Sequence, residues 1–104
     1  MHKSDTEYSI LKKLEENPYL TQRQISKEIG VSLGKTNYVI NALIDKGWLK
    51  LQNFKRSDNK LGYSYLLTTQ GITEKTILAR KFLKIKSDEY NRLKEEIKNL
   101  RNEI

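Results

Sequence analysis

The chain has 104 residues, which is enough for one compact domain with a protruding element, because domains typically contain about 100–150 residues. It contains no cysteine, which excludes a disulfide framework and thiolate metal sites, and it has no apolar run long enough for a membrane span or a secretion signal. We therefore expect a cytoplasmic protein that has no membrane partner and needs no metal or cofactor.

The net charge of +7 is concentrated in the middle of the chain. Residues 21–62 carry eight basic side chains against three acidic ones. A local excess of this kind attracts polyanions, with nucleic acid first and acidic membrane surfaces second.

The N-terminal segment predicts a helix that begins at Ser4 or Asp5 and stops at Asn17, before Pro18. A second helix is predicted over residues 22–28. Its start is indicated by Thr21 and Gln24, which have the spacing of a capping box, and its end by Gly30.

A third helix is predicted between Ser32, a suitable N-cap, and Gly47. Two short helices joined by a tight glycine-containing turn are typical of a helix-turn-helix. The positions expected to be buried recur at helical spacing and are Thr36, Val39, Ile40 and Leu43.

The hydrophobic period then changes to that of β-structure at residues 48–51 and 63–67, on either side of the polar stretch QNFKRSDNKLG. This pattern predicts a hairpin with a long basic tip, and a helix-turn-helix followed by such a hairpin is a winged helix. From Thr68 onward one long helix is expected. The fold class is therefore mainly α with a small β-hairpin: a winged helix-turn-helix domain at residues 4–68, followed by a long dimerisation helix at residues 69–104.

The order of these elements resembles a known family. TQRQISKEIGVSLGKTNYVINALIDKGWL, the wing and then LTTQG are similar to the winged-helix core of MarR-type transcriptional regulators. NFKRSDNKLGYSYLLT and GITEKTILARKFLKIK resemble a small branch of that family associated with exopolysaccharide (EPS) clusters. The resemblance covers about residues 6–100. It implies a DNA-binding regulator with a role near polysaccharide biosynthesis genes.

The third predicted helix has an unusual outward face. A merely solvated helix favours Glu, Lys, Arg and Gln there, whereas this face has glycine, asparagine and tyrosine with a single lysine. Asparagine can bond adenine through two atoms, lysine can bond guanine, and small groups allow close approach to base edges. An ordinary surface or the edge of a protein interface would also fit. The candidate residues of this recognition helix are Ser32, Gly34, Lys35, Asn37, Tyr38 and Asn41.

Phosphate contacts are expected at the starts of the second and third helices, where free backbone N–H groups and the helix dipole favour anions, and at the tip of the wing. In the resembling family the wing reads Asp-x-Arg. Here it reads Asp58-Asn59-Lys60, so either Lys60 or Arg56 would replace the arginine that reaches the minor groove. A charged hairpin tip is also compatible with a simple solvated loop. Besides Ser32, the candidates are Thr21, Gln22, Arg23, Lys55, Arg56, Asn59 and Lys60.

Two aromatic residues, Trp48 and Tyr65, are interpreted as core residues rather than as parts of a ligand site.

The C-terminal segment has a heptad seam that favours two parallel strands, with isoleucine at a and leucine at d. Parallel pairing would also place Glu89 opposite Lys94 and Glu96 opposite Arg101 of the partner. The alternative is a tail that folds back on its own domain, and a second apolar face that includes Leu78 and Phe82 could pack on the first helix. The candidate interface residues are Leu83, Tyr90, Leu93, Ile97, Leu100 and Ile104.

These patterns favour a homodimeric regulator that binds double-stranded DNA at a palindromic site. The alternative is a winged-helix module that assembles proteins and has only non-specific affinity for nucleic acid. An enzyme is not expected, because the chain has one histidine, no phosphate-binding glycine loop and no convincing acid pair. The operator, the sign of regulation, any effector and the target genes do not follow from these patterns.

Overall fold

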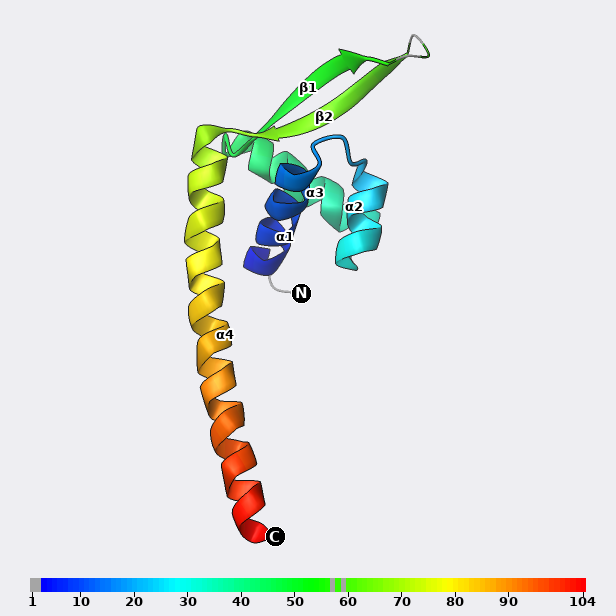
Figure 1. Ribbon diagram of the computed structural model, residues 1–104. Helices are drawn as coiled ribbons and strands as arrows, with labels where there is room; N and C mark the ends of the chain where they lie inside the picture. The colour runs from blue at the N-terminus through cyan, green and yellow to red at the C-terminus, as the bar shows by residue number, and fades with distance from the viewer. Residues whose placement is uncertain (1–2, 57, 59) are drawn as a thin grey trace.

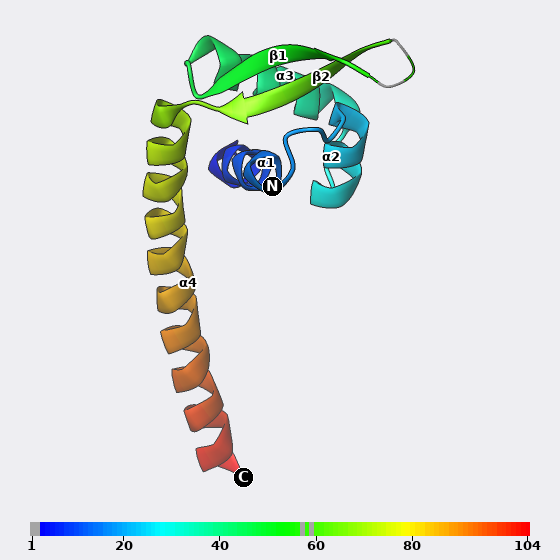
Figure 2. The same ribbon diagram turned by 45° about the horizontal axis from the view of Figure 1, so that its top comes forward.

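The computed structural model describes residues 3–56, 58 and 60–104, and over these residues it has four helices and one two-stranded antiparallel hairpin. Helices α1, α2 and α3 form a compact group beneath the hairpin, whose tip points away from α4 (Figures 1 and 2). The predicted winged helix-turn-helix with a long C-terminal helix is confirmed. The elements are α1 (Lys3–Glu16), α2 (Gln22–Ile29), α3 (Leu33–Asp45), β1 (Leu49–Lys55), β2 (Leu61–Leu67) and α4 (Thr69–Glu103).

The start and the end of α2 follow the predicted local signals. The Thr21 hydroxyl oxygen accepts from the backbone N–H of Gln24 at 3.1 Å, and Gln24 Oε1 accepts from the N–H of Thr21 at 2.8 Å. These two bonds are the reciprocal capping box that the spacing indicates. At the other end Gly30 has φ 73°, which a residue with a β-carbon rarely adopts.

Helix α3 ends in a Schellman motif at Gly47, whose φ is 79°. The N–H of Gly47 donates to the carbonyl of Ile44 and the N–H of Trp48 donates to the carbonyl of Leu43, each at 2.9 Å. The motif turns the chain sharply into β1. Trp48 is half-buried against the core, as predicted.

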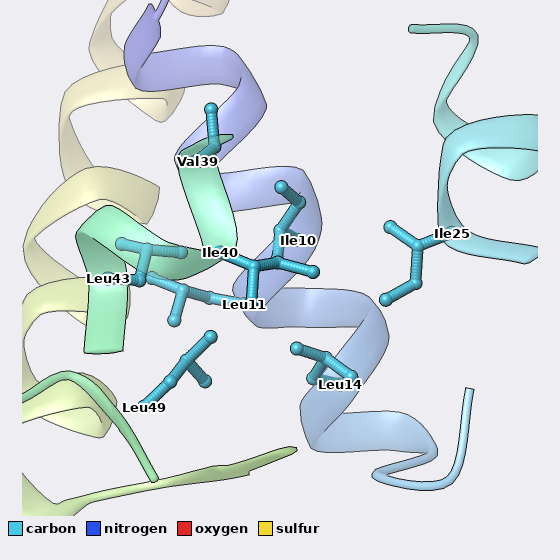
Figure 3. Packing of buried hydrophobic residues seen from close by; sticks show 8 residues of the cluster. All are labelled: Ile10, Leu11, Leu14, Ile25, Val39, Ile40, Leu43 and Leu49. Atoms are coloured by element: carbon cyan, nitrogen blue, oxygen red, sulfur yellow. The ribbon is translucent and has the colours of Figure 1, made fainter. Parts of the chain in front are cut away.

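The core lies between the three short helices and the first residue of the hairpin (Figure 3). The predicted apolar stripe of α3 is buried in full. Full burial of one such aliphatic side chain is worth about 1.5–3 kcal/mol, so this stripe is the main attachment of α3 to the rest of the domain. The buried cluster comprises Ile10, Leu11, Leu14, Ile25, Val39, Ile40, Leu43 and Leu49.

An ion pair joins α1 to the end of α3. Lys46 Nζ lies 2.8 Å from a carboxylate oxygen of Glu7, which is 7% exposed, and 4.6 Å from the centre of the Trp48 ring. The same ammonium group therefore contacts α1 and the residue that precedes β1.

Helix α1 begins at Lys3, one residue before the first predicted start.

The hairpin strands are longer than predicted. The pairing runs from Leu49 opposite Leu67 to Lys55 opposite Leu61, so residues 52–55 and 61–62 belong to strands and not to the loop. The mostly polar composition of residues 52–55 fits their exposure, and only Phe54 among them is half-buried. A hairpin that projects into solvent keeps its backbone ladder with little apolar face. The tip of the wing is correspondingly short.

Helix α4 starts against the turn that leads into the hairpin. Thr68 is its N-cap, and the N–H of Thr68 donates to the carbonyl of Trp48 at 3.1 Å. The predicted second apolar face packs in part on α1: the ring of Phe82 lies 5.4 Å from that of Tyr8, and Leu78 packs against the core. Lys75 adds an ion pair with Glu15 at 2.7 Å.

Beyond Phe82, every residue of α4 is exposed, and the helix runs away from the domain (Figure 1). The molecule is therefore 67 Å long and only 26 × 22 Å across. The alternative in which the tail folds back on its own domain is wrong for this chain. Over the described residues, no helix combines the length and the apolar character that a membrane span requires.

Gly71 generates a stability prediction, because a β-carbon there would overlap the backbone carbonyl of Trp48. Gly71→Ala should destabilise the fold by about 1–3 kcal/mol, since neither backbone can move freely. For a small domain this corresponds to a fall in Tm of about 4–8 °C per kcal/mol.

Gly34→Ala is the matched control, because nothing lies within 4 Å of a β-carbon built at Gly34. That substitution should leave Tm unchanged or raise it, since alanine is the better helix former. Thermal unfolding followed by circular dichroism measures both. Equal Tm values for the two variants would contradict the proposed close contact.

Candidate nucleic-acid interface

The outward face of α3 contains the five residues predicted for it. Gly34, Asn37, Tyr38 and Asn41 are exposed, and Lys35 is half-buried. Tyr38 is 71% exposed, so its ring and hydroxyl group face solvent. The buried stripe on the opposite side holds the helix in place, and this face is turned toward solvent.

The two asparagines of this face are joined in a hydrogen-bonded chain. Asn41 Nδ2 donates to Asn37 Oδ1 at 3.2 Å, and Asn37 Nδ2 donates to Gln22 Oε1 at 3.0 Å. Gln22 Nε2 in turn donates to the hydroxyl oxygen of Tyr65 at 3.1 Å. We call these four residues the amide relay. It connects α3 to the start of α2 and to strand β2.

The amide relay refines three predictions. Gln22 was expected to contact phosphate, but both ends of its side-chain amide bond other side chains. Asn37 likewise uses its oxygen and one N–H group within the protein. Tyr65 packs against the core as predicted, but its hydroxyl group is part of the relay and so belongs to this surface as well.

The starts of α2 and α3 have the predicted N-caps, Thr21 and Ser32. The hydroxyl oxygens of Thr21 and Ser32 accept from backbone N–H groups at 3.1 Å each, which leaves each hydroxyl hydrogen available to a phosphate oxygen. Arg23 is exposed in the first turn of α2. Backbone N–H groups at helix starts favour anions, so both ends suit a phosphate backbone.

A hollow of about 490 Å³ lies between the start of α2 and the hairpin. The ring of Tyr19 packs edge-on against that of Phe54, with 5.2 Å between the ring centres, and both residues line the hollow. Three residues predicted to contact phosphate line this one hollow: Thr21, Gln22 and Arg56.

The predicted cations at the tip of the wing differ in whether they form an ion pair. Arg56 is paired with Asp58 at 3.2 Å, and the N–H of Lys60 donates to the other carboxylate oxygen of Asp58 at 3.2 Å. Lys55 and Lys60 are exposed, and the ion pairs found among the described residues do not include them. Of the two candidates for the wing contact, Arg56 already forms an ion pair, so Lys60 is the cation more available to a phosphate. Asn59 lies outside the described residues.

The contributions of Tyr65, Tyr19 and Phe54 to this surface were missed at the level of sequence. The relay bond between Gln22 and Tyr65 joins residues 43 positions apart, and the bond between Gln22 and Asn37 spans 15 positions. Neither capping signals nor hydrophobic periodicity carries information about contacts between such distant residues.

Within the part of the chain that the structure describes, no three His, Cys, Asp or Glu side chains gather in a possible metal site. The predicted interface residues of the tail are all exposed, on α4 or at its C-cap: Leu83, Tyr90, Leu93, Ile97, Leu100 and Ile104.

Residues 3–50 match the family model described as winged helix-turn-helix DNA-binding. The solved structure of the transcriptional regulator SlyA is similar, with a TM-score of 0.61 and 25% sequence identity over 74% of this chain and 53% of that one. The chain has the winged helix-turn-helix fold of MarR-type regulators. The matched part of this chain spans about half the length of SlyA.

Two further structures agree with this fold over more of the chain. The PcaV transcriptional regulator from Streptomyces coelicolor has a TM-score of 0.63 and 18% identity over 93% of this chain and 76% of that one. A MarR/EmrR family transcriptional regulator from Acinetobacter sp. ADP1 has a TM-score of 0.60 and 21% identity over 94% of this chain and 73% of that one. Among curated proteins, no sequence matches significantly.

The N-cap of α3 generates a prediction about the scaffold of this surface. Ser32→Ala should lower the free energy of unfolding by about 1 kcal/mol, because the N–H of Lys35 loses its acceptor. Ser32→Asp should retain most of the stability, since aspartate is an equally good N-cap. Urea unfolding of both variants measures the difference. Equal losses in the two variants would show that the cap does not stabilise α3.

Proposed function

We propose that the chain is a transcriptional regulator that binds specific sequences of double-stranded DNA as a parallel homodimer in the cytoplasm. The observation that carries the proposal is the exposed polar face of α3, which has little charge although the chain around it is basic. A base-reading surface needs neutral donors and acceptors, while the attraction to phosphate is supplied by its neighbours.

In this proposal α3 enters the major groove. Lys35 and Asn41 are suited to guanine and adenine edges respectively, Gly34 allows close approach, and Tyr38 reaches the groove wall or a phosphate. The starts of α2 and α3 bind the flanking phosphates through Thr21, Ser32 and their backbone N–H groups. The wing follows the DNA to the next minor groove, where Lys60 and Lys55 meet the backbone.

The exposed tail is the proposed dimerisation element. We assign residues 4–68 to DNA binding and residues 69–104 to dimerisation. A parallel pair of α4 helices would cover the apolar seam and bring Glu89 beside Lys94 of the partner subunit. Two-fold symmetry would then present two copies of α3 to one face of the duplex. This arrangement predicts a palindromic site with half-sites about 34 Å apart, or one helical turn.

The similar structures support the general class of function in this proposal. SlyA, PcaV and the Acinetobacter protein are all described as transcriptional regulators, and PcaV has also been solved in complex with its natural ligand. The resemblance of the wing and of the first part of the tail to the EPS-associated branch is the basis for proposing exopolysaccharide biosynthesis genes as targets.

The alternative is a winged-helix module that assembles proteins, and the long exposed apolar seam of α4 is the observation that favours it. The two functions differ in their dependence on DNA sequence. A regulator must prefer particular duplexes, whereas an assembly module with a basic surface binds all duplexes alike.

Selection of bound duplexes from a random pool tests the proposal directly. We expect an enriched palindrome with half-sites one turn apart, and an affinity that falls steeply with salt as counterions are released. Recovery of unselected sequences, or equal affinity for selected and random duplexes, would reject sequence-specific regulation and favour the assembly module.

Two substitutions should separate base reading from phosphate binding. Asn41→Ala should cost about 1–3 kcal/mol at particular base pairs only, because it removes a neutral base contact. Lys60→Ala should weaken binding to all sequences alike and reduce the salt slope by about one, because it removes a cation. Fluorescence anisotropy against a set of single-base variants of the selected duplex measures both. An unchanged base preference in Asn41→Ala would reject its assignment as a reader.

The dimer can be tested on the seam itself. Ile97→Asp combined with Leu100→Asp should give monomers, because two carboxylates would be buried between the helices. Asn99→Asp combined with Asn102→Asp adds the same charge at heptad positions c and f, outside the seam, and should remain dimeric. Light scattering distinguishes the two states. A persistent dimer in the first variant would show that the interface lies elsewhere.

A further inference from the structure

We infer that Tyr65, Gln22 and Asn37 act as positioning residues that orient the side-chain amide of Asn41 to read an adenine. This inference rests on the proposed function, because it presupposes that α3 contacts base pairs. It adds a specific division of roles to that function: Asn41 is the reader, and the other members of the amide relay determine which atoms Asn41 presents.

The hydrogen bonds of the relay favour one member as the base reader. A side-chain amide has two N–H groups and one carbonyl oxygen with two lone pairs. Asn37 uses its oxygen for Asn41 and one N–H for Gln22, so both ends of its amide already bond within the protein. Asn41 uses only one N–H, at 3.2 Å from Asn37, and keeps its oxygen and its other N–H.

Those two remaining groups are the ones that bond adenine. In the major groove adenine offers an N6 amino donor and an N7 acceptor, which match one carbonyl oxygen and one N–H of asparagine. Asn41 is also exposed, and its bond to Asn37 restrains the side chain of Asn41. A restrained amide loses less conformational entropy when it binds, so the relay favours a single orientation of the reader.

The polarity of the relay depends on Tyr65. A tyrosine hydroxyl can accept or donate, so in principle the three amides could all reverse. In the structure the hydroxyl oxygen accepts from Gln22 at 3.1 Å, which leaves its own hydrogen unused in this bond. Tyr65 also lines the hollow that contains Thr21 and Arg56. A phosphate oxygen bound there would take the tyrosine hydrogen and leave Tyr65 only as an acceptor.

A phosphate contact at the hollow would thereby fix the polarity in which Asn41 keeps its oxygen free. Cooperative polarisation along hydrogen-bonded chains acts in the same direction. The relay therefore couples a backbone contact near the wing to base reading on α3. Tyr65 and Gln22 become determinants of specificity although neither needs to touch a base.

The test uses Tyr65→Phe, which removes only the hydroxyl group, with Tyr63→Phe as the matched control. Tyr63 is 58% exposed on the same strand, and no hydrogen bond of its hydroxyl group is found among the described residues. Selection from a random pool first identifies the base pair whose preference Asn41→Ala abolishes. We expect an adenine at that position in the duplexes selected by the full-length protein.

For Tyr65→Phe the preference for adenine at this position should fall about fivefold to tenfold, within the range that a bidentate contact provides. The salt slope should change little, because no cation is removed. Loss of the phosphate contact at the hollow should weaken binding to all duplexes alike. Gln22→Met should have the same effect on the preference and keeps the side-chain volume. Tyr63→Phe should leave the preference intact.

A double-mutant cycle adds a readout that a general loss of stability would not produce. In the Asn41→Ala background, Tyr65→Phe should have no further effect on base preference, because both act through the same amide. Thermal unfolding of each variant confirms folding, and Gln22→Met carries the test if Tyr65→Phe does not fold.

The outcomes separate this inference from the proposed function. If the unmodified protein selects no sequence, both fail. If it selects a sequence that depends on Asn41, but Tyr65→Phe and Gln22→Met retain the full preference, the positioning role is overturned while sequence-specific binding stands. A base other than adenine at the Asn41-dependent position would overturn the assignment of the reader.

Discussion

The contact between the first turn of α4 and the carbonyl of Trp48 fixes how the wing and the tail leave the helical core. Gly71 packs directly against that carbonyl, and the N–H of Thr68 donates to it at 3.1 Å. The same short segment ends α3 at Gly47 and begins β1 at Leu49. Because the wing and the tail both leave from this point, its geometry sets the angle between the hairpin and α3 and sends α4 away from the hairpin tip (Figure 2).

The proposed DNA surface depends on this junction because its parts come from separate elements. The outward face of α3 supplies neutral polar groups, the starts of α2 and α3 supply N–H groups and hydroxyls, and the wing supplies cations. The amide relay ties these elements together through side chains and not only through the apolar core. A surface built in this way can separate attraction to the backbone from discrimination among bases, because the lysines of the wing and the asparagines of α3 stand on different elements.

Several features were predictable because their physical causes are local. The cap at Thr21 needs only the residue three positions later, and the cap at Ser32 needs only the start of its own helix. The buried stripe of α3 follows from helical periodicity. The strands were predicted too short, because three of the four residues at 52–55 are polar and polarity was interpreted as a loop. A solvent-facing hairpin needs no apolar face, so its length depends on pairing with β2, which no local pattern specifies.

The sequence by itself determined the order of elements, the capped helix ends, the basic wing and the composition of the face of α3. Tertiary structure alone decided that Asn37 and Gln22 are committed to each other, that Tyr65 joins them, that Arg56 is paired with Asp58, and that the tail extends instead of folding back. The physical reason is that helix starts, ends and periodicities arise from interactions within a few residues. A side-chain hydrogen bond between α2 and β2 exists only after the core and the junction at Trp48 have brought those elements together.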